Sequence, residues 1–324
     1  MKHEQTDNIG YGYEKRRQGN LDCLSNKKTF RDSFKEMMDS VTKPYSECIQ
    51  YLVDNIKLDP YFAEFFQWSL ANNIPVVSPL AATNPDEFNN PNLISIVNNI
   101  QLHAARIGEY IVKSYDPSKT TIVLISTKKS DDEVLGAPLR TFFQQGKGNR
   151  FTFEEYSSVY TMEMKMIPGK QYLVLVSSSD KQFVMPTLDK LAKMKNNGSQ
   201  VELFGHPNWI KQDYNTDKLQ ALHTRITSSY TVDYKSRDVI SFVKKYRKAY
   251  NFEPGEYAFK GFDIGFYFGK MLAEHGAGYV KYLRQEKYKG LHNSFEFIRD
   301  QKVGYFNTSL SLLEYKNYAL NPVE

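Results

Sequence analysis

The segment IPVVSPLAATNPDEF, residues 74–88, joins an apolar run to a loop of small polar residues. The run from Ile74 is continuously apolar until Ser78, as in a strand that is covered on both faces. Beyond Pro79 the apolar content falls, and alanines, a threonine and an asparagine follow. Small residues at a strand end let backbone and hydroxyl groups approach a ligand closely, so this loop is our first candidate for a binding site.

Apolar runs and amphipathic stripes alternate along the chain from residue 74 onward. The runs predict further buried strands at 121–126, 172–177 and 201–206. Between them, apolar residues three or four positions apart predict helices; the members of these two stripes are Ile100, Ala104, Ile107 and Ile111, and Phe183, Val184, Leu188, Leu191 and Ala192. This order of strand and helix predicts an α/β fold with parallel sheets.

The two ends of the chain differ from this middle part. Towards the C-terminus we expect an amphipathic helix over 239–250, a buried helix that begins at Asp263 or slightly earlier, and a terminal hairpin within 303–323. The first 58 residues are mostly polar and charged, and they predict helices near 30–42 and 45–57 but no buried strand.

Length and composition indicate a folded chain of two lobes. The chain has 324 residues, of which 41% are hydrophobic and 14% aromatic. Its 42 basic and 37 acidic residues are mixed along the sequence, and the net charge of +5 is too mild to indicate a nucleic-acid partner. We recognise no signal peptide and no membrane-spanning segment. The sequence permits a disulfide between Cys23 and Cys48 but does not require one.

Signatures of catalysis are missing from the sequence. Glycine-rich nucleotide-binding loops, zinc-protease motifs and the nucleophile motif of hydrolases do not occur, and the six histidines lack metal-ligand spacing. We therefore expect no enzyme activity, no cofactor and no metal, and surface or capping roles for the histidines. Solvation or helix capping explains the carboxylates that could serve an enzyme, namely Glu154, Glu155, Asp180 and Asp263.

Three predicted strands end in small hydroxyl residues. These are Ser78, the pair Ser126 and Thr127, and the run 177–179. Since ligands gather at the carboxyl ends of parallel strands, such residues suit hydrogen bonds to a small zwitterion or a sugar. The alternative is that each hydroxyl caps the helix that follows it.

The run ANNIPVVSPLAATNPDEFNNPNLISI, residues 71–96, resembles lobe I of type I periplasmic binding proteins, the group of branched-chain amino acid receptors. The segments TTIVLIST, YLVLVSSS, VELFGHPNW and HTRITSSYTVDY follow in the order of that family, so the resemblance covers about residues 60–324. The sequence is especially similar to the substrate-binding-like proteins of Bacteroidetes-type bacteria. Some of those proteins carry peptidoglycan-binding repeats.

This resemblance implies two Rossmann-like lobes that close about a hinge of three crossings, near 91–98, 224–234 and 301–309. Lobe I is then expected at 1–97 and 232–305, lobe II at 98–231, and the third crossing and hairpin at 306–324. Residues 1–58 depart from the family pattern, so lobe I is expected to be incomplete. One hypothesis is that this segment is translated in a shifted frame and rejoins the family pattern near Pro60.

The resemblance also implies a ligand site in the cleft between the lobes. In the receptors, the corresponding residues bind the carboxylate and ammonium groups of an amino acid, and these roles carry over to Ser78, Ala82 and Thr83. Lobe II departs from the family, because it reads STKKSDDEVLG where a Tyr-Gly pair is common. The cleft residues expected there by position alone are Lys128, Ser178, His206 and Trp209.

The function implied is non-catalytic binding of a small, polar, amino-acid-like ligand, in service of ABC transport. The expected partners are therefore that ligand and membrane transporter subunits or the peptidoglycan machinery, and the expected location is the periplasm or cell envelope. An alternative is an envelope interaction module that keeps the two lobes but has lost small-molecule binding. For Trp209 a place in the core is as plausible as stacking on a ligand.

Overall fold

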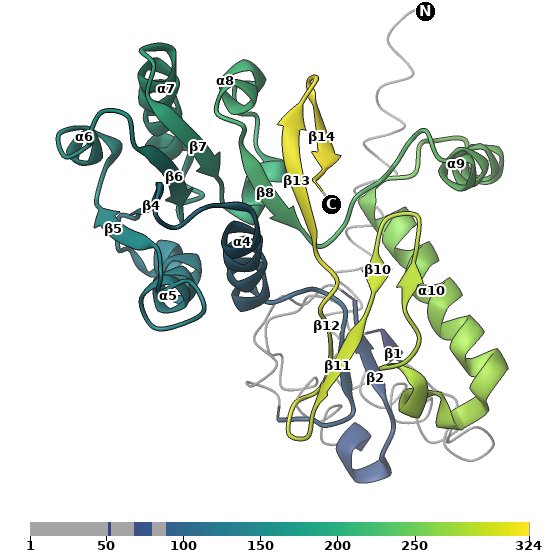
Figure 1. Cartoon of the computed structure of the whole chain (residues 1–324). Coiled ribbons are helices and arrows are strands. Elements are labelled where there is room, and N and C mark those ends of the chain that lie inside the picture. The colour runs from purple at the N-terminus through teal and green to yellow at the C-terminus, as the bar shows by residue number, and fades with distance from the viewer. Residues whose placement is uncertain (1–50, 53–67, 80–88, 324) are drawn as a thin grey trace, which may run out of the picture. The chain divides into compact units, whose positions relative to one another are not determined.

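The computed structural model describes residues 51–52, 68–79 and 89–323, all of which belong to one compact unit, Tyr51–Glu324. Its strands form two large sheets, one of five strands and one of seven (Figure 1). We call the part built around the five-stranded sheet lobe I and the part built around the seven-stranded sheet lobe II. The predicted α/β fold with mainly parallel strands is confirmed.

The seven strands of lobe II follow the order β14-β13-β8-β7-β6-β4-β5. The five from β5 to β8 run parallel, and the last two along the chain, β13 and β14, add an antiparallel hairpin to the edge. Their bounds are β4 Thr120–Ile125, β5 Thr152–Tyr156, β6 Gln171–Val176, β7 Gln200–Phe204, β8 Arg225–Ser228, β13 Ser311–Lys316 and β14 Ala319–Pro322.

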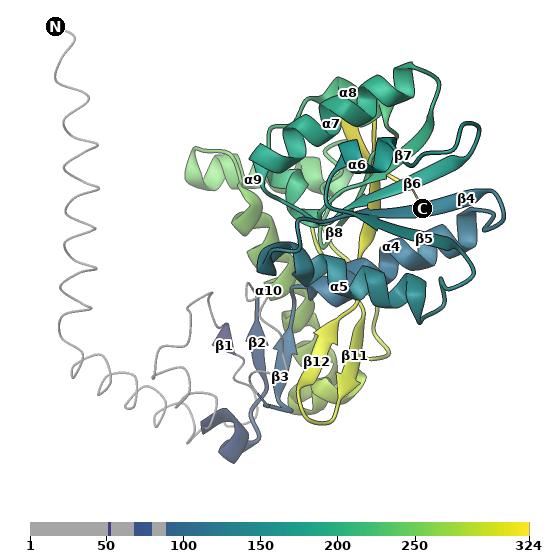
Figure 2. The same ribbon diagram turned by 90° about the vertical axis from the view of Figure 1, so that its left-hand side faces the viewer.

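Helices cover both faces of this sheet, as Figure 2 shows. Ile122 and Leu124 of β4 pack in the core formed with α4 and α5, whereas Val123 and Ile125 pack in the core formed with α6, α7 and α8. Burial on alternate sides explains why the strand is apolar at every position. The helices are α4 Ile100–Ser114, α5 Ser130–Gln144, α6 Val159–Glu163, α7 Lys181–Asn196 and α8 Thr216–Ala221.

The five-stranded sheet of lobe I is built from segments far apart in the chain, in the order β1-β2-β3-β12-β11. The strands are short, with β1 at Tyr51–Leu52, β2 at Val76–Ser78, β3 at Leu93–Ser95, β11 at Phe297–Asp300 and β12 at Gly304–Asn307. The prediction of a helix over 45–57 is therefore wrong at residues 51–52, which form strand β1 and pair in parallel with β2. The helix predicted near 30–42 lies outside the described residues.

The long helix of lobe I, α10 Glu256–His275, begins before the predicted start. Asp263 does not cap it, because its buried carboxylate accepts hydrogen bonds from three backbone amides of a loop instead. The helix is also less buried than expected. Phe268 and Met271 pack in the lobe I core, but Phe262 and Phe266 are 42% and 52% exposed, since the sheet covers only one side of the helix.

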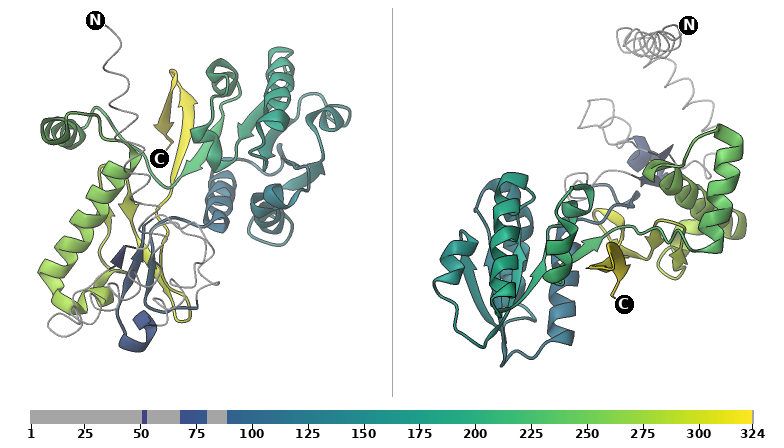
Figure 3. Two further views of the ribbon diagram at one scale, coloured as in Figure 1. Left: turned by 180° about the vertical axis from the view of Figure 1, so that it is seen from behind. Right: turned by 90° about the horizontal axis from the view of Figure 1, so that it is seen from above.

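The predicted amphipathic helix over 239–250 is confirmed as α9, Arg237–Tyr250. It stands apart from both sheets (Figures 1 and 3). Val239 is its one fully buried residue, and Phe242 connects it to α10 through ring contacts of 4.9 Å with Phe259 and Phe262. The apolar stripe of α9 is thus only half covered.

Within residues 51–52, 68–79 and 89–323, three segments pass between the lobes, at 96–99, 229–236 and 308–310. Hydrogen bonds hold the first crossing to the strand that leads into the third. The Asn98 amide donates to the carbonyl of Asn307 at 2.7 Å, and the Asn307 amide donates to the carbonyl of Ile96 at 3.2 Å. Of the region predicted as one terminal hairpin, β12 lies in lobe I and the hairpin β13–β14 lies in lobe II.

Four elements of lobe II were not predicted, α5, β5, α6 and α8. The α5 sequence contains Gly136 and Pro138, which are poor helix residues, and β5 is a half-exposed edge strand without a continuous apolar run. The remaining short elements are the 3₁₀ helices η2 Pro207–Lys211 and η3 Gly276–Tyr282 and the strands β9 Tyr288–Lys289 and β10 Ser294–Phe295. None of the described helices is long and apolar enough to cross a membrane.

Candidate functional site

A cleft of about 1140 Å³ is lined by residues of the first and second crossings and of both lobes. Its described walls come from the start of α10 on the lobe I side and from η2, α5 and the ends of β6 and β7 on the lobe II side. The lining includes Val97 to Gln101, His103, Asp131, Val134, Ser179, His206 to Asn208, Ile210, Lys211, Thr227 to Tyr230, Glu256, Tyr257, Lys260 and Asn293.

Asn98, which lines this cleft, carries an unpaired acceptor. Its side chain is almost fully buried, and its amide nitrogen is used by Asn307. Among the described residues, its Oδ1 atom has no hydrogen-bond partner. Leaving a buried acceptor unsatisfied costs about 1–3 kcal/mol, so a ligand that donates a hydrogen bond here would recover that energy.

His103 ties α4 to the second crossing. Its Nδ1 atom lies 2.8 Å from Thr227 Oγ1, and its Nε2 atom lies 3.5 Å from Ser229 Oγ. Burial lowers the pKa of His103 to about 3, so the ring is neutral at neutral pH. A neutral imidazole between two hydroxyl groups acts here as a polar connection within the cleft wall.

His206, one of the residues expected in the cleft, does line it. Its Nδ1 atom accepts the backbone amide of Asn208 at 3.0 Å and so caps η2. Burial lowers the pKa of His206 to about 4, which keeps the ring neutral, and the free proton then resides on Nε2. His206 can therefore donate one hydrogen bond.

The charges that line the described cleft balance. Asp131 and Glu256 are acidic, and Lys211 and Lys260 are basic. Lys211 comes from lobe II and Lys260 from lobe I, and both lie near the same carboxylate, Glu256, at 3.7 Å and 3.5 Å. A wall with both signs of charge suits a zwitterion or another polar molecule better than an apolar one.

The lobe I residues expected to bind a ligand are only partly described. Ser78 is the last residue of β2, pairs with Ser95 of β3 and is 4% exposed. It is not among the residues that line the cleft. Ala82 and Thr83 lie outside the described residues, so their predicted roles stay predictions.

Trp209 and Ser178 lie behind the cleft wall of lobe II. Trp209 is fully buried, donates from Nε1 to the carbonyl of Ser178 at 2.9 Å and packs edge-on against Tyr214. Its ring fills the space beside Gly205, where a Cβ atom would come within 2.3 Å of it. Ser178 is also buried, and its hydroxyl accepts the backbone amide of Asp180. Its neighbour Ser179 lines the cleft instead.

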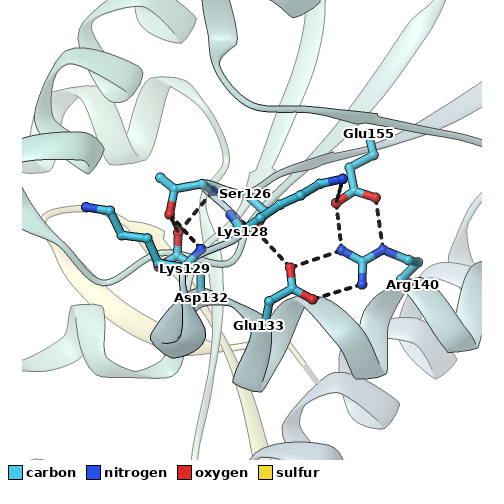
Figure 4. Close-up of polar contacts among 8 residues, drawn as sticks. Ser126, Lys128, Lys129, Asp132, Glu133, Arg140 and Glu155 are labelled. Carbon is cyan, nitrogen blue, oxygen red and sulfur yellow. Dashed lines mark hydrogen bonds and ion pairs between the residues drawn. The ribbon is translucent and has the colours of Figure 1, made fainter.

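Lys128 belongs to a polar network at the end of β4 (Figure 4). The Arg140 guanidinium lies between two carboxylates, 3.0 Å from Glu133 and 2.6 Å from Glu155, and Lys128 approaches Glu155 at 3.9 Å. Arg140 lowers the pKa of both carboxyl groups through these hydrogen bonds. The acidic side chains at this strand end are therefore already paired.

The hydroxyl residues that follow β4 take part in the same network. Ser126 Oγ lies 3.4 Å from Glu133 and accepts the amide of Lys128, while Thr127 donates to Asp132. Neither lines the cleft. Neither hydroxyl caps α5, whose N-cap residue Lys129 has no side-chain cap hydrogen bond; both bond instead to carboxylates in the first turn of that helix.

Sequence reasoning missed the residues that form most of the wall. Asn98 follows a strand end, which is a recognisable signal, and Glu256 and Lys260 are four residues apart on a helix. No sequence pattern indicated that Lys211 and Tyr230 would join them. The expectation of surface or capping histidines is wrong for His103 and His292, which are buried, whereas the buried His206 does cap η2. Within the described residues, no three His, Cys, Asp or Glu side chains are grouped to hold a metal ion.

Comparison with solved structures gives the fold a family likeness. An ABC transporter substrate-binding protein of Desulfitobacterium hafniense in complex with Leu has a TM-score of 0.55 at 14% identity over 84% of this chain and 80% of that one. A putative branched-chain amino acid ABC transporter protein of Rhodospirillum rubrum has a TM-score of 0.54 at 14% identity over 79% and 74%. At such identities the likeness concerns the fold, which is that of type I periplasmic binding proteins.

Sequence comparison gives a different and local likeness. No family model matches the chain. A stretch of 72 residues, 22% of this chain, is 42% identical to the polyol phosphate phosphatase PYP1 of Saccharomyces cerevisiae and 38% identical to Pdp3-interacting factor 1 of Schizosaccharomyces pombe. The chain spans about a third of the length of these relatives, 30% and 31%.

Proposed function

We propose that the protein binds a small, polar, amino-acid-like ligand in the cleft between its lobes without transforming it. The observation that carries this proposal is the cleft itself, which has room for such a molecule and is lined by Asn98, whose buried side-chain oxygen is unpaired within the described part of the chain. Pockets of several hundred Å³ with a few placed polar groups are the usual form of small-molecule sites. The solved proteins of the same fold are named for ligand binding and transport, which supports the proposal.

Three crossings give this cleft a means of closing. In the described part of the chain, three short segments join the lobes, so a ligand that contacts both would favour a closed arrangement by its differential affinity. The hydrogen bond between Asn98 and Asn307 ties the first crossing to the strand that leads into the third. We propose delivery to an ABC transporter, in the periplasm or envelope, as the use of this binding.

Thermal unfolding in the presence of candidate ligands tests the proposal. A ligand that binds only the folded protein at 100 times its Kd adds about 2.7 kcal/mol, which raises Tm by several degrees. The panel consists of amino acids, dicarboxylates, small peptides and cell-wall fragments. Lack of any shift across the panel would contradict the proposal and favour an interaction module that has lost small-molecule binding.

A blocking variant locates the binding. Ser179→Trp places a large ring on the cleft wall and should abolish the ligand-induced shift. Ser241→Trp introduces the same ring on the exposed side of α9 and serves as the matched control. Equal ligand-induced shifts in the two variants would place binding outside this cleft. Hydrolysis of a phosphate ester by the protein, with the Ser179→Trp variant equally active, would instead assign a function to the region similar to the phosphatase.

A further inference from the structure

Two lysines from opposite lobes converge on one carboxylate at the edge of the cleft. Lys211 of η2 lies 3.7 Å from Glu256 Oε2, and Lys260 of α10 lies 3.5 Å from Glu256 Oε1. Both ammonium groups also lie near the face of the Tyr230 ring, at 6.0 Å and 5.9 Å from its centre. All of these side chains line the cleft.

The contacts to Glu256 leave both lysines incompletely paired. Charge-assisted N–H···O bonds are usually about 2.7–2.9 Å long, so contacts of 3.5 Å and 3.7 Å are weak. Lys260 is 8% exposed, and burial lowers its pKa. Of the described residues, Glu256 is the one ion-pair partner recorded for either lysine. Such a partly desolvated ammonium group gains from a closer anion.

Tyr230 supplies a third polar group at this place. Burial and the neighbouring Glu256 carboxylate raise the pKa of Tyr230 to about 12, so its hydroxyl keeps its proton at neutral pH and remains a donor. The ring is stacked on His292 at 4.3 Å with an interplanar angle of 9°. Tyr230 belongs to the second crossing and is therefore held between the two lobes.

The loop behind Tyr230 is held firmly. Tyr230 forms a β-bridge with Asn293, and Thr231 donates its backbone amide to the carbonyl of His292 at 2.9 Å. The buried Asp263 carboxylate accepts the amides of Leu291, His292 and Asn293 at 2.7–2.8 Å. Because these contacts fix the loop, the Tyr230 ring has a defined position before any ligand arrives.

We propose that Lys211, Lys260 and the Tyr230 hydroxyl form a binding site for an anionic oxygen group of the cleft ligand, a carboxylate or a phosphate. Glu256 occupies this anion site when no ligand is bound, and an incoming anion competes with it. The inference rests on the proposed function, since the anion is one part of the molecule held in the cleft. Because the lysines belong to different lobes, a bound anion also holds the lobes together.

Matched pairs of ligands and charge-neutral variants test the anion site. Binding of L-glutamate against L-glutamine, and of O-phospho-L-serine against L-serine, is measured by calorimetry at constant ionic strength. Glu256→Gln removes the internal competitor at nearly constant shape and should tighten binding of the anionic member about tenfold. Lys260→Met and Lys211→Met should weaken binding of the anionic member about tenfold or more and leave the neutral member unchanged.

The controls separate the anion site from folding and from the proposed function. Glu274→Gln removes a carboxylate that pairs with Lys270 on the same helix at 3.7 Å, away from the cleft, and should change nothing. Lys211 is more than half exposed, so its variant folds even if Lys260→Met does not. An anionic member of either ligand pair that binds equally to the wild type and to both lysine variants overturns the anion site and leaves cleft binding standing. Absence of binding by every compound overturns both.

Discussion

The two lobes of this protein are built by different means. Lobe II comes mostly from one continuous part of the chain, its strands have up to six residues, and helices cover both faces of its sheet. Lobe I assembles strands of two to four residues that lie before and after the main part of lobe II in the sequence. Its largest helix, α10, leaves Phe262 and Phe266 exposed. A lobe with local contacts can be read from its sequence, whereas a lobe joined from distant segments depends on long-range packing.

Trp209→Ala should give the largest loss of stability, because it removes the largest fully buried side chain of lobe II. We expect the free energy of unfolding to fall by about 4 kcal/mol, measured by urea denaturation. Tyr257→Ala, at a position 69% exposed, is the control and should change it by less than about 0.5 kcal/mol. A variant with wild-type stability and weakened ligand binding would contradict the core role and support ligand stacking by Trp209.

Asp263→Ala should destabilise lobe I in particular. The change leaves three loop amides without their acceptor, and we expect a loss of about 3 kcal/mol. Hydrogen exchange should accelerate at residues 291–293 and in α10, while the strands of lobe II keep their protection. Equal acceleration in β4 and β6 would show that the two lobes unfold as one cooperative unit.

His103 should make stability depend on pH at the junction of the lobes. Its folded pKa of about 3 lies below the ordinary value of 6.5, so between these values the unfolded chain binds a proton that the folded chain excludes. Stability is therefore lost as the pH falls through this window, by about 2 kcal/mol at pH 5.

The His103→Gln variant isolates that contribution. The difference in unfolding free energy between pH 7.5 and pH 5 should shrink by about 2 kcal/mol in urea titrations. His206, whose pKa is also lowered, to about 4, remains in both proteins and cancels in the comparison. An unchanged difference would show that His103 is protonated as readily in the folded state as in the unfolded one.

Arg140→Met should have the smallest effect, although Arg140 joins α5 to β5 through Glu155 and also pairs with Glu133 of its own helix. The side chain is one-quarter exposed, so solvent screens its ion pairs, and we expect a loss of about 1 kcal/mol. Adding 1 M NaCl should reduce the difference between variant and wild type. A loss as large as that of Trp209→Ala would mean that this network, not the apolar core, holds the edge of lobe II.

The predictable parts of the fold are those with local signals. The strands at 121–126 and 172–177 and the stripe from Ile100 to Ile111 appear at nearly the predicted positions, since each buries its own continuous apolar surface. By contrast, α5 and β5 lack that surface, because α5 carries Gly136 and Pro138 and β5 is an edge strand. The start of α10 was misplaced because Asp263, which resembles a cap, binds a loop instead.

The candidate site was less accessible to sequence reasoning than the fold. His206 was expected in the cleft and lines it, but Asn98, Lys211, Tyr230 and Glu256 come from four separate elements. Their proximity results from three crossings and the packing of α10 on a sheet whose strands are distant in sequence. No spacing along the chain encodes such an arrangement.

The sequence by itself determined the alternation of strands and helices, because burial on one or both faces leaves an apolar period in each segment. It also determined which strands end in small hydroxyl residues. Only the tertiary structure decided which of those ends face a cleft: Ser126 and Thr127 bond to carboxylates in the first turn of α5, whereas Ser179 lines the cleft wall. The reason is physical, since a hydroxyl group forms the same hydrogen bond with a helix terminus as with a ligand, and only the surrounding packing selects between them.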